Sequence, residues 1–138
     1  MKDSFILDAC ALIAYFKKEV GFKLVLQYFE QANNEEIFLF MHKLNLLEVY
    51  YGFYRDDGKE TAEAVLCDAS SLPITFVDDL GDPLFYEAGR LKATYDISFA
   101  DSIALALASV KGEPLITCDH HDFGMVEPKE QIKFTWIR

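Results

Sequence analysis

Short apolar runs alternate along the chain with longer segments in which apolar residues recur at helical spacing. The short runs predict five strands, at residues 4–8, 37–40, 73–77, 114–118 and 132–136. The helical spacing predicts six helices, at residues 11–18, 22–33, 42–54, 60–71, 84–95 and 99–111. Alternation of this kind is typical of the α/β class, in which helices cover a parallel sheet.

Two of the predicted strands run directly into an aspartate, Asp8 near the N-terminus and Asp119 near the C-terminus. Continuous apolar runs of this length predict strands that are buried on both faces of a parallel sheet. Open α/β sheets bind their ligands outside the carboxyl ends of the strands. Two carboxylates about 4 Å apart repel by roughly 4 kcal/mol at an effective dielectric constant of about 20. A bound cation or a raised pKa relieves that repulsion, so the pattern suggests a metal site.

Two further acids lie on predicted helices. Glu48 shares a helix face with Leu44 and Tyr51, and a carboxylate on that apolar stripe must reach water, a partner or a cation. Taken alone, Glu48 is better explained as an acid at the edge of the apolar face, with its carboxylate in water. Asp101 follows Ser98 by three residues, as in many helix starts, so stabilisation of the helix N-terminus explains it as well as a ligand role does.

The segment at residues 117–123 holds the densest group of polar side chains. Along a strand, Thr117 and Asp119 point to one side and Cys118 to the other, and Asp122 adds a carboxylate one turn later. An acidic helix cap after a strand explains this segment equally well. Taken together, these acids are stronger evidence for a metal site than any one of them alone. A site with only oxygen ligands suits Mg²⁺ or Mn²⁺. The set consists of Asp8, Glu48, Asp101 and Asp119, with Thr117 and Asp122 beside them.

The composition is that of one folded domain, residues 1–138, with 51% hydrophobic residues. No segment reaches the roughly 18 apolar residues of a membrane span, so we expect no membrane partner. Met1 leads directly into the first predicted strand, so we expect no signal peptide. Three cysteines, Cys10, Cys67 and Cys118, form no disulfide framework and fit a reducing cytoplasm. The net charge of −10 argues against nucleic-acid binding by overall electrostatics, but not against an enzyme that acts on nucleic acid through a metal.

Four short motifs, in this order, resemble those of PIN domains, and most closely those of the VapC-type toxins of toxin–antitoxin pairs. They are FILDACAL at residues 5–12, LEVYYG at 47–52, SFADSIA at 98–104 and LITCDHHDF at 115–123. The resemblance spans nearly the whole chain. It implies a three-layer, Rossmann-like α/β fold with a central, mostly parallel five-stranded sheet. It also implies a Mg²⁺- or Mn²⁺-dependent endoribonuclease that hydrolyses RNA phosphodiester bonds.

Carried over to the matching positions, the resemblance assigns roles to six residues. Asp8, Glu48, Asp101 and Asp119 form the catalytic site, with Asp8, Asp101 and Asp119 as the metal ligands. Thr117 is a supporting hydroxyl and Asp122 an auxiliary acid. The resemblance further implies an RNA substrate, a basic antitoxin as the protein partner, and a homodimer.

One departure from the family pattern keeps other interpretations open. Many relatives carry Ser or Thr where this chain has Cys10, and a thiol orients water or a ligating carboxylate less well than a hydroxyl. The chain is then either a PIN-like binding module, whose acids hold a cation or a basic partner without catalysis, or a nuclease with altered activity. A PIN nuclease of RNA processing, without an antitoxin, is also open.

Three other interpretations are disfavoured by the sequence. A phosphoryl-accepting receiver would need a lysine at the end of the strand at residues 114–118, and a haloacid-type hydrolase would need Asp-x-Asp after the first strand. A zinc site from Cys10, Cys118, His120 and His121 lacks a Cys-x-x-Cys pair, and Cys118 should point away from the acids. We interpret His42 as an exposed polar residue near a helix start.

Overall fold

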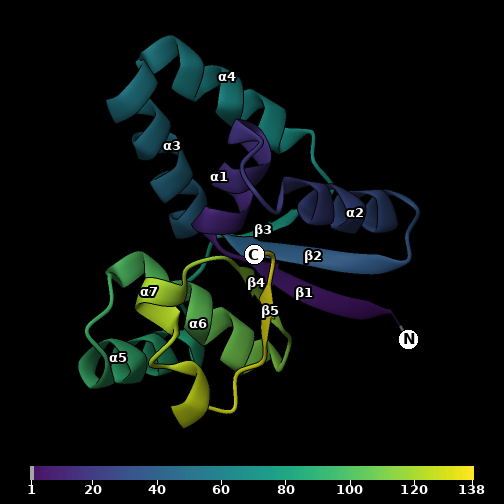
Figure 1. Cartoon of the computed structure of the whole chain (residues 1–138). Coiled ribbons are helices and arrows are strands. Elements are labelled where there is room, and N and C mark those ends of the chain that lie inside the picture. Colours follow the sequence, from purple (N-terminus) through teal and green to yellow (C-terminus); the bar gives the residue numbers. More distant parts are fainter. Residues whose placement is uncertain (1) are drawn as a thin grey trace.

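The computed structural model describes residues 2–138 and shows a five-stranded sheet between two layers of helices (Figure 1). Met1 lies outside the described residues. The strands are β1 (Asp3–Leu7), β2 (Ile37–His42), β3 (Thr75–Val77), β4 (Leu115–Thr117) and β5 (Phe134–Trp136). The helices are α1 (Ala9–Lys17), α2 (Phe22–Asn33), α3 (Lys43–Asp57), α4 (Lys59–Ser70), α5 (Leu84–Thr94), α6 (Phe99–Lys111), α7 (His120–Phe123) and the short 3₁₀ turn η1 (Glu127–Lys129).

The strand order β3-β2-β1-β4-β5 places the N-terminal strand in the middle of the sheet. Every neighbouring pair is parallel, so the sheet is entirely rather than mostly parallel. From β1 the chain adds β2 and then β3 on one side of β1. It then crosses over and adds β4 and β5 on the other side of β1. The order therefore reverses between β1 and β4. In open α/β sheets this reversal opens a crevice at the carboxyl ends of the two strands, where ligands bind.

A hydrophobic core fills each side of the sheet. On one face, α1 to α4 bury residues such as Leu12, Val25 and Val49. On the other face, α5 and α6 pack around Leu91 and Leu105. Figure 1 shows α1 and α2 on the opposite side of the sheet from α5 and α6. The middle of α6 is buried on every side, which fixes the helix firmly and with it the position of the acid in its first turn.

The predicted helices at residues 22–33 and 99–111 are confirmed at both ends as α2 and α6, and the other predicted elements are confirmed with ends shifted by a few residues. The four-residue helix α7 and the turn η1 were not among the predicted helices, although the acidic helix cap considered for residues 117–123 is the start of α7. The expectation that the first strand is buried on both faces is wrong for its first half. Asp3 is exposed, and Ser4 and Phe5 are only partly buried, because this half of β1 extends beyond the residues that pair with β4.

The interpretation of His42 as an exposed residue is wrong. Its side chain is 2% exposed and caps α3, because Nδ1 accepts a hydrogen bond from the Leu44 amide at 3.0 Å. Nε2 lies 2.8 Å from the carbonyl oxygen of Asp79. Since β2 extends to residue 42, two residues beyond the predicted strand end, the imidazole is enclosed and both of its nitrogens have partners. Of the helices in residues 2–138, none has the length and apolar character needed to cross a membrane.

Candidate functional site

Asp8 occupies the junction between β1 and α1. It is the N-cap of α1, because Oδ1 accepts a hydrogen bond from the Ala11 amide at 2.9 Å. Its other oxygen, Oδ2, accepts a hydrogen bond from the hydroxyl of Thr117. The side chain is buried, and burial raises the pKa of Asp8 to about 7, although the two hydrogen bonds act in the opposite direction.

Asp119 occupies the matching junction between β4 and α7. Its Oδ1 accepts a hydrogen bond from the Asp122 amide at 3.0 Å and so caps α7. Its own amide donates to Oγ1 of Thr117 at 3.1 Å. The single hydroxyl of Thr117 therefore joins the acid that follows β1 to the acid that follows β4. The role of Thr117 as a supporting hydroxyl stays a prediction, and these two bonds are the contacts on which it would rest.

Asp101 lies in the first turn of α6, where the amide of Asp101 donates to Oγ of Ser98 at 3.1 Å. The predicted helix start is confirmed. Asn45 on α3 holds the same turn, because its Nδ2 donates to the carbonyl oxygen of Ala100 at 2.8 Å. Asn45 is buried, and its Oδ1 has no hydrogen-bond partner among residues 2–138. We did not select Asn45 from the sequence; its one signal was its place one helical turn before Glu48.

The tightest group of acids consists of Asp101, Asp119 and Asp122, which each offer one carboxylate oxygen within 4.8 Å of the other two. Burial raises the pKa of Asp101 to about 8, and its hydrogen bond to Asp122 and the neighbouring negative charges add to the rise. The pKa of Glu48 is also raised, by burial first and then by repulsion from Asp119 and Asp122. The structure thus brings together all the acids selected from the sequence.

Within that group the positions differ from those we expected of the ligands. Asp122, expected as an auxiliary acid, lies in the tightest triad, whereas both oxygens of Asp8 already accept hydrogen bonds. The triad has only carboxylate oxygens, the donors that Mg²⁺ and Mn²⁺ prefer. Burial and neighbouring negative charges raise the pKa values of Asp101 and Glu48, and a bound cation would offset that effect. The residues present therefore fit a divalent cation of this kind.

A cleft of about 370 Å³ opens over these acids. The side of α3 that faces the core is formed by Asn45, Val49 and Phe53, while Leu44 and Tyr51 are exposed. The stripe that we took for the apolar face of this helix is therefore its outer edge. The lining includes Asp8, Cys10, Glu48, Tyr51, Arg55, Asp101, Asp119 and Asp122.

Cys10 and Cys118 form a disulfide, with their Cα atoms 6.1 Å apart. The expectation that the three cysteines stay unpaired is therefore wrong for these two, while Cys67 is free and exposed. The pairing of β1 with β4 brings residues 108 positions apart side by side, which the spacing of cysteines in the sequence does not reveal. The disulfide also excludes the four-ligand zinc site, and the ring of His120 stacks on Trp136 instead.

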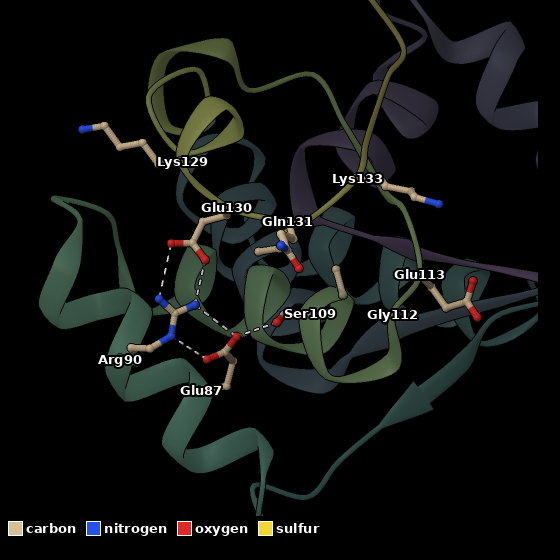
Figure 2. A pocket seen from close by; sticks show the side chains of 11 residues that line it. Glu87, Arg90, Ser109, Gly112, Glu113, Lys129, Glu130, Gln131 and Lys133 are labelled. Atoms are coloured by element: carbon tan, nitrogen blue, oxygen red, sulfur yellow. Dashed lines mark hydrogen bonds and ion pairs between the residues drawn. The ribbon is translucent and has the colours of Figure 1, made fainter.

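A second hollow, of about 550 Å³, lies away from the acids between α5, α6 and the segment before β5 (Figure 2). Three of its charged side chains, Glu87, Arg90 and Glu130, are paired with one another, as Figure 2 shows. Arg90 contacts Glu87 at 2.8 Å and Glu130 at 2.7 Å, and the hydroxyl of Ser109 donates to Glu87. These bonds fasten α5 to α6 and to the chain before β5, so we interpret this hollow as structural.

The sequence matches the family model for the PIN domain over residues 5–126. A comparison with curated proteins finds no match. Among solved structures, the chain is similar to DNA-bound VapBC from Salmonella typhimurium (TM-score 0.74, 17% identity, 100% of each chain). It is also similar to VapBC2 from Rickettsia felis, bound to a promoter DNA fragment (TM-score 0.73, 17% identity, 96% of this chain and 97% of the other). A third similar structure is VapC20 of Mycobacterium tuberculosis, described as a Sarcin-Ricin loop cleaving toxin (TM-score 0.66, 13% identity, 88% and 94%). At these identities the structures establish a shared fold.

Proposed function

The chain belongs to the PIN domain family, and from this premise we propose that it is a Mg²⁺- or Mn²⁺-dependent endoribonuclease that hydrolyses RNA phosphodiester bonds. The observation that carries the proposal is the triad of Asp101, Asp119 and Asp122, whose oxygens lie within 4.8 Å of one another at the reversal point of the sheet. The site combines a hard-cation donor set with an open cleft of about 370 Å³. A similar structure is described as that of a Sarcin-Ricin loop cleaving toxin, which supports RNA as the substrate class.

Each acid has a distinct part in this proposal. Asp101, Asp119 and Asp122 would hold the cation, with Asp8 beside them as a further ligand, direct or through water. A bound Mg²⁺ or Mn²⁺ would polarise phosphoryl oxygen and lower the pKa of a nearby water. Glu48 lines the same cleft, and its raised pKa suits it to orient the attacking water and accept its proton.

Thr117 and the capping bonds of Asp8 and Asp119 fix the directions of these carboxylates before any ligand arrives. Preorganised groups lose little freedom in the transition state, which is the general advantage of ligands built on strand ends and helix starts.

The outer edge of α3 supplies contacts for the RNA chain. Tyr51 is about half exposed beside the cleft, and its ring can stack on a base. Arg55, one turn further along, is the single basic residue in the cleft lining within residues 2–138. Its contact with Asp56, at 3.0 Å, lies on the surface, where such pairs contribute little and exchange readily. We assign Arg55 to a phosphate next to the one that is cleaved.

We further propose that the protein is the toxin of a toxin–antitoxin pair, held by a basic antitoxin. Two of the similar structures are toxin–antitoxin complexes, and the net charge of −10 complements a basic partner. An arginine of the partner, placed among the acids, would replace the cation.

Exposed aromatic rings at the starts of α5 and α6 support the homodimer. These rings are Phe85, Tyr86 and Phe99.

The decisive experiment is incubation of the purified protein with total cellular RNA and Mg²⁺ or Mn²⁺, followed by mapping of new RNA ends. We expect defined ends with the native chain, and none with Asp8→Asn or Asp101→Asn. Asp68→Asn, which removes an exposed carboxylate on α4, is the matched control and should cleave normally. If the native chain and both site variants give the same ends, or none with either metal, the chain is a non-catalytic binding module.

A further inference from the structure

The disulfide joins the two chain segments that carry the acids. Cys10 lies two residues after Asp8, in the first turn of α1. Cys118 lies between Thr117 and Asp119, in the short connection from β4 to α7. The register of β1 and β4 ends at Leu7 and Ile116, so the disulfide lies just past the last paired residues.

The connection from β4 to α7 has few other links to β1 and α1. The amide of Asp8 donates to the carbonyl oxygen of Ile116 at 3.3 Å, and the Thr117 hydroxyl bonds to Asp8. Beyond Thr117, α7 has only four residues, and a helix that short is not stable by itself. The disulfide is therefore the covalent restraint nearest to Asp119, on the side where the backbone leaves the sheet.

The two cysteines differ in their exposure. Cys118 is buried in the core between the sheet and α1, at 7% exposure. Cys10 is partly exposed and forms part of the wall of the acidic cleft. A reductant in that cleft reaches the Cys10 sulfur first, and the same cleft is the route for a cation.

We propose that Cys10 and Cys118 form a reversible disulfide, exchanged by dithiol reductants, whose formation strengthens divalent-cation binding by the acids of the cleft. The pair is a redox-modification site placed against the acid cluster. This inference rests on the metal-binding part of the proposed function. It goes beyond that function because it makes the affinity of the acids for the cation depend on the thiol–disulfide state of the surroundings.

The exchange is balanced by the dithiol itself. One thiolate of the reductant attacks the Cys10 sulfur, the bond to Cys118 breaks, and the Cys118 sulfur leaves as a thiolate that takes up a proton. The second thiol of the reductant then attacks the mixed disulfide and releases Cys10 as a thiol. Two electrons pass to the protein, and the reductant ends as a cyclic disulfide. Oxidation by a disulfide of the same class runs the two steps backwards.

Linkage gives the proposal a second, independent consequence. If the disulfide strengthens cation binding by some factor, bound cation must favour the disulfide over the two thiols by the same factor. Mg²⁺ is the probe of choice, because it binds oxygen ligands and has little affinity for thiols. Both directions of the coupling are then measurable without any RNA.

The experiment compares the oxidised chain with the chain reduced by dithiothreitol and then freed of reductant under anaerobic conditions. Alkylation under denaturing conditions and mass spectrometry should find one modified cysteine, Cys67, in the oxidised form and all three in the reduced form. Mg²⁺ titrations by calorimetry and by thermal melting should then give at least fivefold tighter binding to the oxidised form. A dithiothreitol redox titration should move toward the disulfide by a similar factor when Mg²⁺ is present.

Two variants separate the possible causes. Cys10→Ala with Cys118→Ala should bind Mg²⁺ like the reduced chain under all conditions, and Cys67→Ala should retain the full redox response. Affinities within twofold in the two redox states would overturn the inference and leave the proposed function standing. A chain that loses its far-ultraviolet circular dichroism on reduction would show a purely structural disulfide and also overturn it. Absence of Mg²⁺ binding in both states would remove the metal from the proposed function, and this inference with it.

Discussion

Asp101→Asn should make the metal-free protein more stable while it removes the stabilisation by metal. In the triad, the oxygens of Asp101, Asp119 and Asp122 lie within 4.8 Å of one another. At that distance two full charges repel by about 3.5 kcal/mol at an effective dielectric constant of about 20. Burial first, and then the hydrogen bond to Asp122 and the neighbouring charges, raise the pKa of Asp101 to about 8, so Asp101 keeps a proton and part of this repulsion is avoided. Asparagine has nearly the same shape and never ionises.

The size of the effect follows from that pKa. Each pKa unit corresponds to about 1.4 kcal/mol, and we take about half of the rise from 3.8 to about 8, because solvent in the open cleft screens these charges. We therefore expect Asp101→Asn to raise the free energy of unfolding at pH 8 by about 2–3 kcal/mol without metal. For a chain of this length that is a rise of roughly 6–10 °C in Tm.

Metal should close the stability gap between the two proteins. A cation at about 100 times its dissociation constant stabilises the folded state by about 2.7 kcal/mol. Thermal melts at pH 8, with and without millimolar Mn²⁺, should show a clear upward shift for the native chain and almost none for Asp101→Asn. Asp68→Asn should melt like the native chain in both conditions. A less stable variant without metal, or equal Mn²⁺ shifts in the two proteins, would refute the electrostatic account of the cluster.

Three further predictions follow from the same contacts. The free energy of unfolding of the metal-free chain should fall as pH rises from about 5.5 to 8.5. In this range native Asp8 and Asp101, with pKa values of about 7 and about 8, keep protons that the unfolded chain has released. Urea titrations check this, and a rise in stability over the same pH range would contradict it. Thr117→Val removes the hydroxyl that donates to Asp8 and accepts from the amide of Asp119. It should lower the free energy of unfolding by about 1–3 kcal/mol in urea titrations and weaken Mn²⁺ binding. Thr75→Val, at an exposed strand position, should do neither. Asn45→Ala frees the first turn of α6, so it should lower kcat for RNA more than it changes KM; an unchanged kcat would show that the first turn of α6 stays in place without it.

The fold followed closely from the sequence where one physical signal dominates. The ends of α6 are marked by the Ser98 cap and by Gly112, which adopts the left-handed conformation, and both signals are local. The parallel sheet followed from the alternation of apolar runs and helices. Asp8, Asp101 and Asp119 were found because each follows a strand or begins a helix, and the carboxyl ends of parallel strands meet at one edge. Glu48 was found from its place on a helix face.

The failures concern features that depend on contacts between distant segments. Nothing near His42 in the sequence indicates that its side chain is buried. Its burial depends on the length of β2 and on its contact with the carbonyl oxygen of Asp79. The disulfide depends on strand order, since Cys10 and Cys118 are neighbours only because β4 lies beside β1. The closeness of Asp122 to Asp101 depends on α7, a helix too short to have a periodic signal.

The raised pKa values and the need for a positive ligand are two consequences of one arrangement. Folding forces the carboxyl groups of Asp8, Glu48 and Asp101 into a partly dry cleft, and the free energy of their ionisation rises accordingly. That free energy is recovered by any ligand that brings positive charge to the same oxygens. A divalent cation does this and then attracts phosphate, whereas an arginine of a basic partner does it and fills the cleft. In the proposed function, activation by metal and inhibition by an antitoxin therefore compete for one set of oxygens. A chain with a net charge of −10 can then act on a polyanion only in the first of these two states.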